Sequence, residues 1–166
     1  MVTTETGKKG EVIETTAVTD EKGASTSNTV KVSATGVVKS IVVEIKNNKG
    51  KVTEKDTYKP VSGEKVALVS VDVVKKALEI PAKIEAADGK TYKVTKIAKG
   101  AFAENKKLKN ITIVGALKSV GHHAFYGIAK NAVIVITNVT KKEFEATKKK
   151  LVASGLPSSV KIVRKK

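Results

Sequence analysis

Apolar residues recur at a fixed spacing in the second half of the chain. The segment VTKIAKGAFAENKKLKNITI, which begins at Val94, has the same apolar pattern as LKSVGHHAFYGIAKNAVIVI, which begins 23 positions later at Leu117. A period of this size indicates stacked supersecondary units that bury their apolar edges against each other, and it predicts a solenoid. The matching pairs are Val94 and Leu117, Ile97 and Val120, Ala101 and Ala124, Phe102 and Phe125, Ile111 and Ile134, and Ile113 and Ile136.

The first half of the chain has the period-two alternation of β-strands instead. Val30 and Val32 alternate with polar residues, and an apolar run over residues 37–45 is followed by the turn-like sequence NNKG at residues 47–50, which predicts a hairpin. We therefore expect residues 11–60 to form a small β-rich domain, either an Ig-like β-sandwich or an open sheet. Residues 1–10 lack any apolar pattern, so we expect them to be a disordered tail.

An incomplete unit precedes the two repeats. Leu78 and Ile80 have the spacing of the apolar pairs in the repeat strands, so residues 77–84 should contain the strand of this unit. The distance from this strand to the next repeat includes ten extra residues. Because the dipeptide Asp88-Gly89 in the extra segment favours a tight turn, we predict a β-hairpin over residues 84–94 that projects from the stack.

The last 29 residues, 138–166, have the pattern of a cap on the repeats. Thr140 and Glu143 have the spacing of a capping box, in which a hydroxyl and a carboxylate satisfy free amide groups at a helix N-terminus. A short strand over residues 160–163 would follow the helix and cover the open edge of the array. The helix face would be formed by Phe144, Thr147, Leu151 and Val152, and the helix would end at Gly155 and Pro157.

These segments together resemble a known repeat family. The strand Ile80-Pro81-Ala82, the segment DGKTYKVTKIAKGAF and the later LKSVGHHAF are similar to the BspA-type leucine-rich repeats of bacterial cell-surface proteins. The resemblance covers about residues 62–166, and we assign residues 61–166 to the repeat region. It implies a leucine-rich-repeat solenoid in a secreted or cell-surface protein that functions in adhesion by binding a protein or host-surface ligand. Ala98 departs from the family pattern, which has Gly at the position that Gly121 keeps.

The outward residues of the predicted strands are candidates for a binding surface. If the repeated isoleucines point inward, the residues between them point outward. An apolar pair, Val133 and Val135, is unusual on a solvated face, so either the N-terminal region covers it or it belongs to a ligand-binding face. We favour cover within the chain. The candidate binding residues are Thr112, Val114, Val133, Val135 and Thr137.

Positive charge dominates the chain. It carries 32 basic and 16 acidic residues, a net charge of +16, and residues 61–166 contribute +14 of this. Such a field attracts polyanions. Of the basic residues 31 are Lys and only Arg164 is Arg, so the chain has almost none of the guanidinium groups that form bidentate hydrogen bonds with bases and phosphates. It has three Phe, three Tyr and no Trp, and so has few of the aromatic groups on which bases stack. Both features are unlike those of proteins that bind nucleic acid in a sequence-specific way. The lysines either keep the protein in solution or anchor it to anionic cell-wall polymers or glycosaminoglycans, which is our alternative function.

No combination of residues indicates an enzyme. The chain has no Cys, and its only two histidines, His122 and His123, are adjacent and cannot both face one site on a regular element. We expect both to be solvated loop residues rather than a metal or proton site. The serines lie in turn-like segments, and no glycine-rich phosphate loop is present. We therefore predict no catalytic residues, no bound metal and no cofactor.

The hydropathy pattern bears on location. The longest unbroken apolar run, residues 132–136, is far shorter than the ~20 residues needed to cross a bilayer, so we predict no membrane span. The residues after Met1 are polar and show no signal peptide. This fits either a cytosolic protein or a secreted or cell-surface protein whose export signal has been trimmed, and the family resemblance favours the second.

Overall fold

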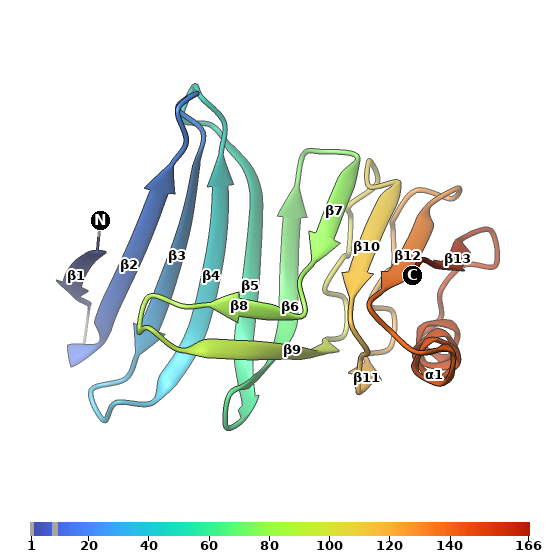
Figure 1. Cartoon of the computed structure of the whole chain (residues 1–166). Helices are drawn as coiled ribbons and strands as arrows, with labels where there is room; N and C mark the ends of the chain where they lie inside the picture. Colours follow the sequence, from blue (N-terminus) through green and yellow to red (C-terminus); the bar gives the residue numbers. More distant parts are fainter. Residues whose placement is uncertain (1, 8–9) are drawn as a thin grey trace.

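The structure is a computed structural model, and it describes residues 2–7 and 10–166 (Figure 1). The chain is mainly β, with a single α-helix among the described residues. The strands form a nine-stranded sheet and a four-stranded sheet. In chain order the elements are β1 (Val2–Thr6), β2 (Val12–Thr19), β3 (Ser25–Val32), β4 (Val38–Lys46), β5 (Val52–Ser62), β6 (Lys65–Val73), β7 (Ala77–Ile80), β8 (Lys83–Glu85), β9 (Thr91–Ile97), β10 (Asn110–Val114), β11 (Ser119–Val120), β12 (Val133–Thr137), α1 (Lys141–Ala153) and β13 (Lys161–Arg164).

Strands β1 to β6 form an antiparallel meander in which each strand hydrogen-bonds to the next along the chain. Residues 11–60 therefore have the open-sheet arrangement, and in the described structure they do not fold into two facing sheets. The predicted boundary at residue 60 lies inside β5. The predicted hairpin after β4 is confirmed, since the Asn47 amide donates to the Lys51 carbonyl at 2.9 Å and Gly50 has a φ of 73°.

The first residues of the chain differ from the prediction. β1 pairs antiparallel with β2, from Val2 opposite Thr16 to Thr6 opposite Val12. The Thr-rich sequence of β1 has no apolar alternation, but Thr has a high strand propensity and suits an exposed edge. The disordered tail expected over residues 1–10 is therefore wrong for β1, and residues 1, 8 and 9 of that tail lie outside the described residues.

Parallel strands bring the 23-residue repeats together. In β10 and β12 the repeated isoleucines are direct partners, Ile111 with Ile134 and Ile113 with Ile136. The incomplete unit takes the next place in the same sheet, since β7 pairs in parallel with β10 on its other side. β9 and β11 pair in parallel in the nine-stranded sheet, again at an offset of one repeat. The predicted alignment of the repeats is thus confirmed at the level of strand register.

The interior between these parallel strands contains a stacked aromatic pair. The Phe102 and Phe125 rings lie 4.7 Å apart between centroids, with an interplanar angle of 13°, and both side chains are buried. The Phe102 amide donates to the Ala124 carbonyl at 2.8 Å. Backbone also passes close to Gly121, where a Cβ would lie only 2.3 Å from the Lys99 nitrogen. Small residues are therefore needed where neighbouring turns approach each other.

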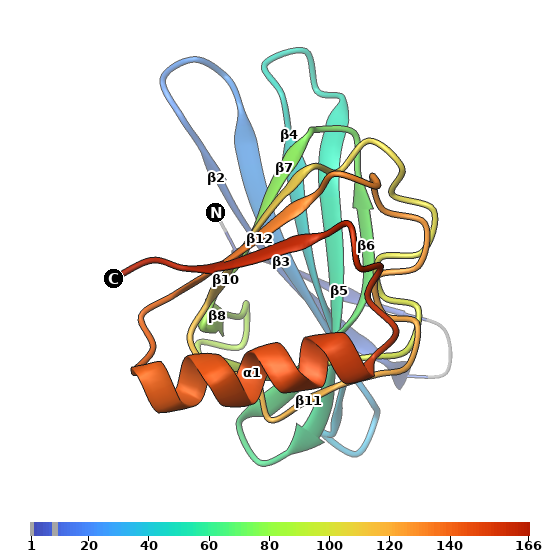
Figure 2. The ribbon, with the colours of Figure 1, turned by 90° about the vertical axis from the view of Figure 1, so that its right-hand side faces the viewer.

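The C-terminal helix and strand form as predicted, with one exception. The Thr140 side chain accepts from the Glu143 amide and the Glu143 carboxylate accepts from the Thr140 amide, so the capping box is present. β13 pairs with the outer edge of β12, and α1 lies beside β11 (Figure 2). Val152 was expected on the buried helix face but is 58% exposed, because it lies about 100° around the helix from buried Leu151.

The predicted hairpin over residues 84–94 is formed by β8 and β9. Its turn is fixed by Asp88, whose carboxylate accepts from the Tyr92 hydroxyl at 2.7 Å. The hairpin does not stand free in solvent, because it lies across the N-terminal strands (Figure 1) and the Asn28 side chain donates to the Glu85 carbonyl at 2.9 Å. Ile84 and Tyr92 are buried there, and burial of these apolar groups accounts for the contact.

Candidate functional site

The five predicted binding residues lie together on the outer face of the four-stranded sheet. We call the surface formed by Thr112, Val114, Val133, Val135 and Thr137 the outer face. Thr112 pairs with Val135 and Val114 with Thr137, and all five side chains are half-buried. The middle row of this surface continues to Glu79 on β7 and to Val163 on β13. The face is therefore a row of small, mostly uncharged side chains that crosses four strands.

The N-terminal strands do not reach the centre of the outer face. In the sheet order β13-β12-β10-β7, two strands separate β12 from the side on which the N-terminal strands lie (Figure 1). The structure thus gives no support to the expectation that the N-terminal region covers Val133 and Val135.

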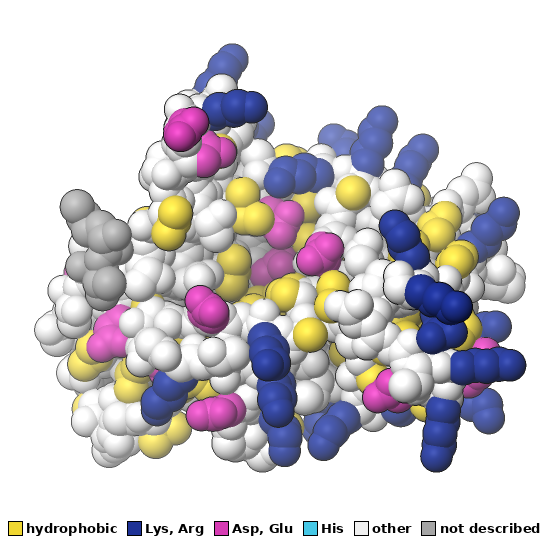
Figure 3. Space-filling view, in the orientation of Figure 1, with side chains coloured by type: hydrophobic (Ala, Val, Ile, Leu, Met, Phe, Trp, Pro, Cys, Tyr) yellow, Lys and Arg dark blue, Asp and Glu magenta, His cyan; other side chains and the backbone are white. Residues whose placement is uncertain are grey.

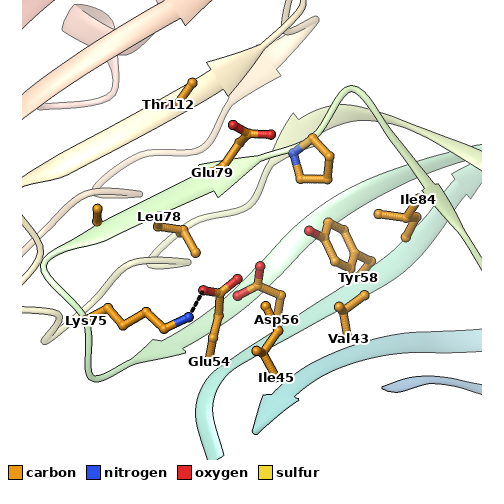
Figure 4. A pocket seen from close by; sticks show the side chains of 12 residues that line it. Val43, Ile45, Glu54, Asp56, Tyr58, Lys75, Leu78, Glu79, Ile84 and Thr112 are labelled. Atoms are coloured by element: carbon orange, nitrogen blue, oxygen red, sulfur yellow. Dashed lines mark ion pairs between the residues drawn. The ribbon is translucent and has the colours of Figure 1, made fainter. Parts of the chain in front are cut away.

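A groove adjoins the outer face at Thr112. On one side it is bounded by the face of β4 and β5 that bears Val43 and Asp56, and on the other side by β7. Its volume is about 520 Å³ (Figure 4). We call it the β7 groove. Figure 3 shows acidic side chains among hydrophobic ones in the same central region. The residues that line it are Val43, Ile45, Glu54, Asp56, Tyr58, Lys75, Ala77, Leu78, Glu79, Pro81, Ile84 and Thr112.

The floor of the β7 groove comes from alternate residues of two paired strands. Glu54, Asp56 and Tyr58 project from one face of β5 because successive side chains of a strand point to opposite faces. Their partners on β4 are apolar: Val43 is opposite Asp56, and Ile45 is opposite Glu54. Two carboxylates are therefore held against an apolar surface.

Asp56 is the most perturbed acid in the groove. Its side chain is only 3% exposed, and its Oδ1 atom has no hydrogen-bond partner. Burial, with a further contribution from the charge of Glu54, raises the pKa of Asp56 to about 7, although a hydrogen bond from the Tyr58 hydroxyl opposes the rise. A carboxyl group in this state is half protonated near neutral pH and attracts a cation when it ionises.

The neighbours of Asp56 respond to the same environment. Burial raises the pKa of Glu54, and the Lys75 ammonium, 3.9 Å from a Glu54 oxygen, partly offsets this. Burial and the two carboxylates also raise the pKa of the Tyr58 hydroxyl, so Tyr58 stays protonated. With Glu79 at the rim, the groove contains three carboxyl groups and one ammonium group.

The β7 groove is not predicted by the sequence pattern. The signal lies in β5, where polar residues occupy both faces of a strand whose neighbour β4 is strongly apolar. Because Glu54 and Asp56 lie on the same face of the sheet as Val43 and Ile45, β5 places charged side chains where the fold buries its residues. The contribution of β7 could not be inferred, because it depends on the chain returning over β5.

The histidines lie away from the β7 groove. His122 and His123 are both exposed in the turn after β11, with ring centroids 3.8 Å apart, and the His123 amide donates to the Ser154 carbonyl at 2.7 Å. Within residues 2–7 and 10–166, no group of three or more His, Asp or Glu side chains could hold a metal ion. In the same residues, no helix has the length and apolar character needed to span a bilayer.

Basic side chains gather at the opposite end of the molecule from β1, around β10, β12, α1 and β13 (Figure 3). Residues 107–166 contain 13 basic and two acidic residues. All five ion pairs found among the described residues lie within residues 11–106, so none of these 13 basic groups is in one. The molecule thus carries an acidic groove near its middle and unneutralised positive charge at its C-terminal end.

Comparison with known proteins gives no further guide. A scan against protein-family models, a search of curated proteins and a search of solved structures each found no match. The resemblance to BspA-type repeats is left as a prediction from the residues.

Proposed function

We propose that residues 61–166 form a short leucine-rich-repeat solenoid of the BspA type and that the chain is a non-catalytic adhesion module of a bacterial cell surface. Three observations support the repeat assignment: the parallel register of β7, β10 and β12, the stacked pair of Phe102 and Phe125, and the small residues where turns approach. In this proposal the N-terminal meander is a sheet that extends the repeats on the β7 side.

A continuous surface carries the proposal of binding. The outer face and the β7 groove meet at Thr112, which belongs to both. The outer face supplies small uncharged side chains, and the groove supplies a hollow with apolar walls and fixed charges. Surfaces of this kind, with polar groups placed around an apolar centre, are typical of sites for a protein or another host-surface ligand.

The experiment measures binding of the full chain to a panel of immobilised host-surface proteins and glycans. Val133→Lys with Val135→Lys places two charges on the outer face, and we expect it to weaken any binding by at least about tenfold. Val37→Lys adds the same charge at an exposed N-terminal turn and serves as the control. Equal binding by the chain and the outer-face variant would exclude the outer face from recognition.

The unpaired basic residues favour a second candidate function, an electrostatic anchor to anionic wall polymers or glycosaminoglycans. We expect the chain to be retained on immobilised heparin at low salt and released well below about 1 M salt, because polyanion binding is dominated by counterion release. Lys141→Glu with Lys142→Glu should lower the eluting salt, and these changes suit a helix N-terminus, so α1 is preserved. Retention that survived about 1 M salt would rule the anchor out.

A further inference from the structure

The free edge of β7 lies along the groove. β7 is the last strand of its sheet, and the other end of the sheet is β13. The Lys76 carbonyl accepts from the Lys109 and Asn110 amides, so it points toward β10. Because backbone groups alternate in direction along a strand, the N–H and C=O groups of Ala77 and Glu79 point away from β10, toward the groove they line.

The groove beneath this edge is acidic, although the molecule as a whole is strongly basic. Glu54, Asp56 and Glu79 outnumber Lys75 three to one there, in a chain of net charge +16. Figure 4 shows the Asp56 carboxylate directed into the space beside Glu54. A carboxylate that is 3% exposed and has an unpartnered oxygen is costly to ionise alone, and a cation inserted beside it would remove that cost.

We propose that the β7 groove binds an extended peptide segment that adds to β7 as a fifth strand of that sheet and places a Lys or Arg side chain against Asp56. This inference rests on the proposed binding function and names its ligand class. In strand addition the main chain of the peptide pairs with the open edge, and alternate side chains enter pockets. Here the inward side chains of the added strand face β4 and β5. Val43, Ile45 and Ile84 would contact apolar or β-branched residues on either side of the basic one.

The geometry implies that binding depends on pH. The charged and titratable groups around Asp56 are Glu54 and Tyr58 on the same strand, Lys75 in the turn before β7, and Glu79 on β7. A bound cation favours the ionised form of Asp56, whose pKa of about 7 lies within the accessible range. Peptide affinity should therefore rise between about pH 6 and about pH 8.

The test uses random linear peptides of about eight residues, displayed on phage and selected against the full chain at low salt and about pH 8. Selected peptides are then synthesised and titrated into ¹⁵N-labelled protein. We expect them to share a Lys or Arg flanked by Val, Ile, Thr or aromatic residues, and to shift the amide signals of Ala77 and Glu79 most. Methylation of the peptide nitrogens that face β7 should abolish binding.

Matched variants separate the groove from general charge. Asp56→Asn should lower the affinity for the peptides by about tenfold or more. In the Asp56→Asn protein, replacing the peptide's basic residue by norleucine should cause no further loss of affinity. Glu79→Gln, at an exposed position, should lower the affinity by a smaller factor. Asp72→Asn removes the same charge from an exposed position of β6 and should leave affinity unchanged.

Several results would overturn the inference: selected peptides without a basic residue, equal affinity for Asp56→Asn, or signal changes centred on the outer face. A chain that sediments as a dimer and dissociates on Asp56→Asn substitution would show that a second copy fills the groove, which also contradicts the proposal. If host ligands depend on Val133 and Val135 but no peptide enters the groove, the proposed function stands and this inference falls. If host ligands do not depend on Val133 and Val135 and no peptide binds in the groove, the proposed function and this inference are both wrong.

Discussion

The regions on the two sides of β6 bury their side chains in different ways. In the described part of β1 to β5 only Val30, Ile41, Asp56 and Tyr58 are buried, and most other side chains are half-exposed or exposed. In the parallel region each repeat contributes several fully buried residues, and Phe102 and Ile111 are 0% exposed. Parallel strands of both sheets bury side chains such as Ile97 and Ile111, whereas the meander is covered on one face and over part of its length. The repeats therefore hold most of the core.

One row of buried side chains runs through both regions. Val30, Ile41, Tyr58, Leu68 and Ile97 are successive partners across β3, β4, β5, β6 and β9, and each is at most 1% exposed. This row, together with the β8–β9 hairpin, joins the meander to the core. The groove opens beside the middle of this row, where Tyr58 is followed on the same face of β5 by Asp56 and Glu54. The candidate site thus lies at the point where the parallel strands give way to the open meander.

The largest expected effect tests whether the repeats hold the core. Phe102→Ala removes one of the two stacked rings and should lower the free energy of unfolding by about 3–5 kcal/mol, because a buried Phe leaves both lost contacts and a cavity. Urea unfolding followed by circular dichroism measures the change. Tyr126→Ala removes a 64% exposed aromatic ring from the turn that follows Phe125 and should stay within about 0.5 kcal/mol. Equal costs for the two variants would contradict the comparison.

Asp56, in the meander, is expected to make the stability of the protein depend on pH. Burial raises the folded-state pKa of Asp56 to about 7, above the ordinary value of 3.8 for an aspartate, so the folded state binds the proton more tightly. The resulting stability is fully present below about pH 4 and is lost as the pH rises through about 7. Asp56→Asn should remove this dependence and exceed the native chain in stability by up to about 4 kcal/mol at pH 8. Urea titrations at several pH values measure it.

Asp72→Asn provides the control for this prediction. Asp72 is exposed on the neighbouring strand β6, and its replacement should not change the slope of stability with pH. Parallel pH profiles for the native chain and Asp56→Asn would show that Asp56 is ionised normally in the folded state.

The sequence predicted the parallel region better than the meander for a physical reason. A repeat specifies register directly, because equivalent residues such as Ile111 and Ile134 must become neighbours if the units stack. The Asp88-Gly89 hairpin and the Thr140 cap are also local, since a few adjacent residues determine each of them. None of these predictions required knowledge of distant parts of the chain.

The candidate site depends on distant parts and was only half predicted. The outer face follows from strand alternation, and its five residues do lie together. The cover expected for Val133 could not be decided from the sequence, because it depends on where the meander attaches. In the sequence, Asp56 resembles any polar residue of an exposed strand. In the structure it is a buried acid, because β7 folds back over β5. The raised pKa of Asp56 therefore results from tertiary burial and not from the local sequence pattern.

Close backbone packing at Gly121 predicts a smaller loss of stability within the repeats. Gly121→Ala would place a Cβ 2.3 Å from the Lys99 nitrogen and 2.6 Å from the Ala98 carbonyl carbon, and backbone atoms cannot move aside cheaply. We expect a loss of about 1–3 kcal/mol, as for other overpacked sites. Gly36→Ala, where no atom lies within 4 Å, tests the meander with the same substitution. Urea unfolding measures the stability of both variants. Because Gly36 has a φ of 77°, Gly36→Ala should lose only the free energy of the backbone strain that Ala suffers there.

The smallest effect concerns the end of the array. Thr140→Ala removes the hydroxyl that accepts from the Glu143 amide at 3.2 Å, and loss of such a cap costs about 1 kcal/mol. The effect should be confined to α1 and its contacts, because the Phe102 and Phe125 stack lies in earlier repeats. Amide hydrogen exchange measures this directly: protection should fall in the first turn of α1 and stay constant at Ile111 and Ile113. Ser159→Ala, at an exposed position beyond the helix, is the control. If exchange also rose throughout β10 and β12, the cap would be stabilising the whole array, and the parallel region would depend on its C-terminal end as the meander depends on β6.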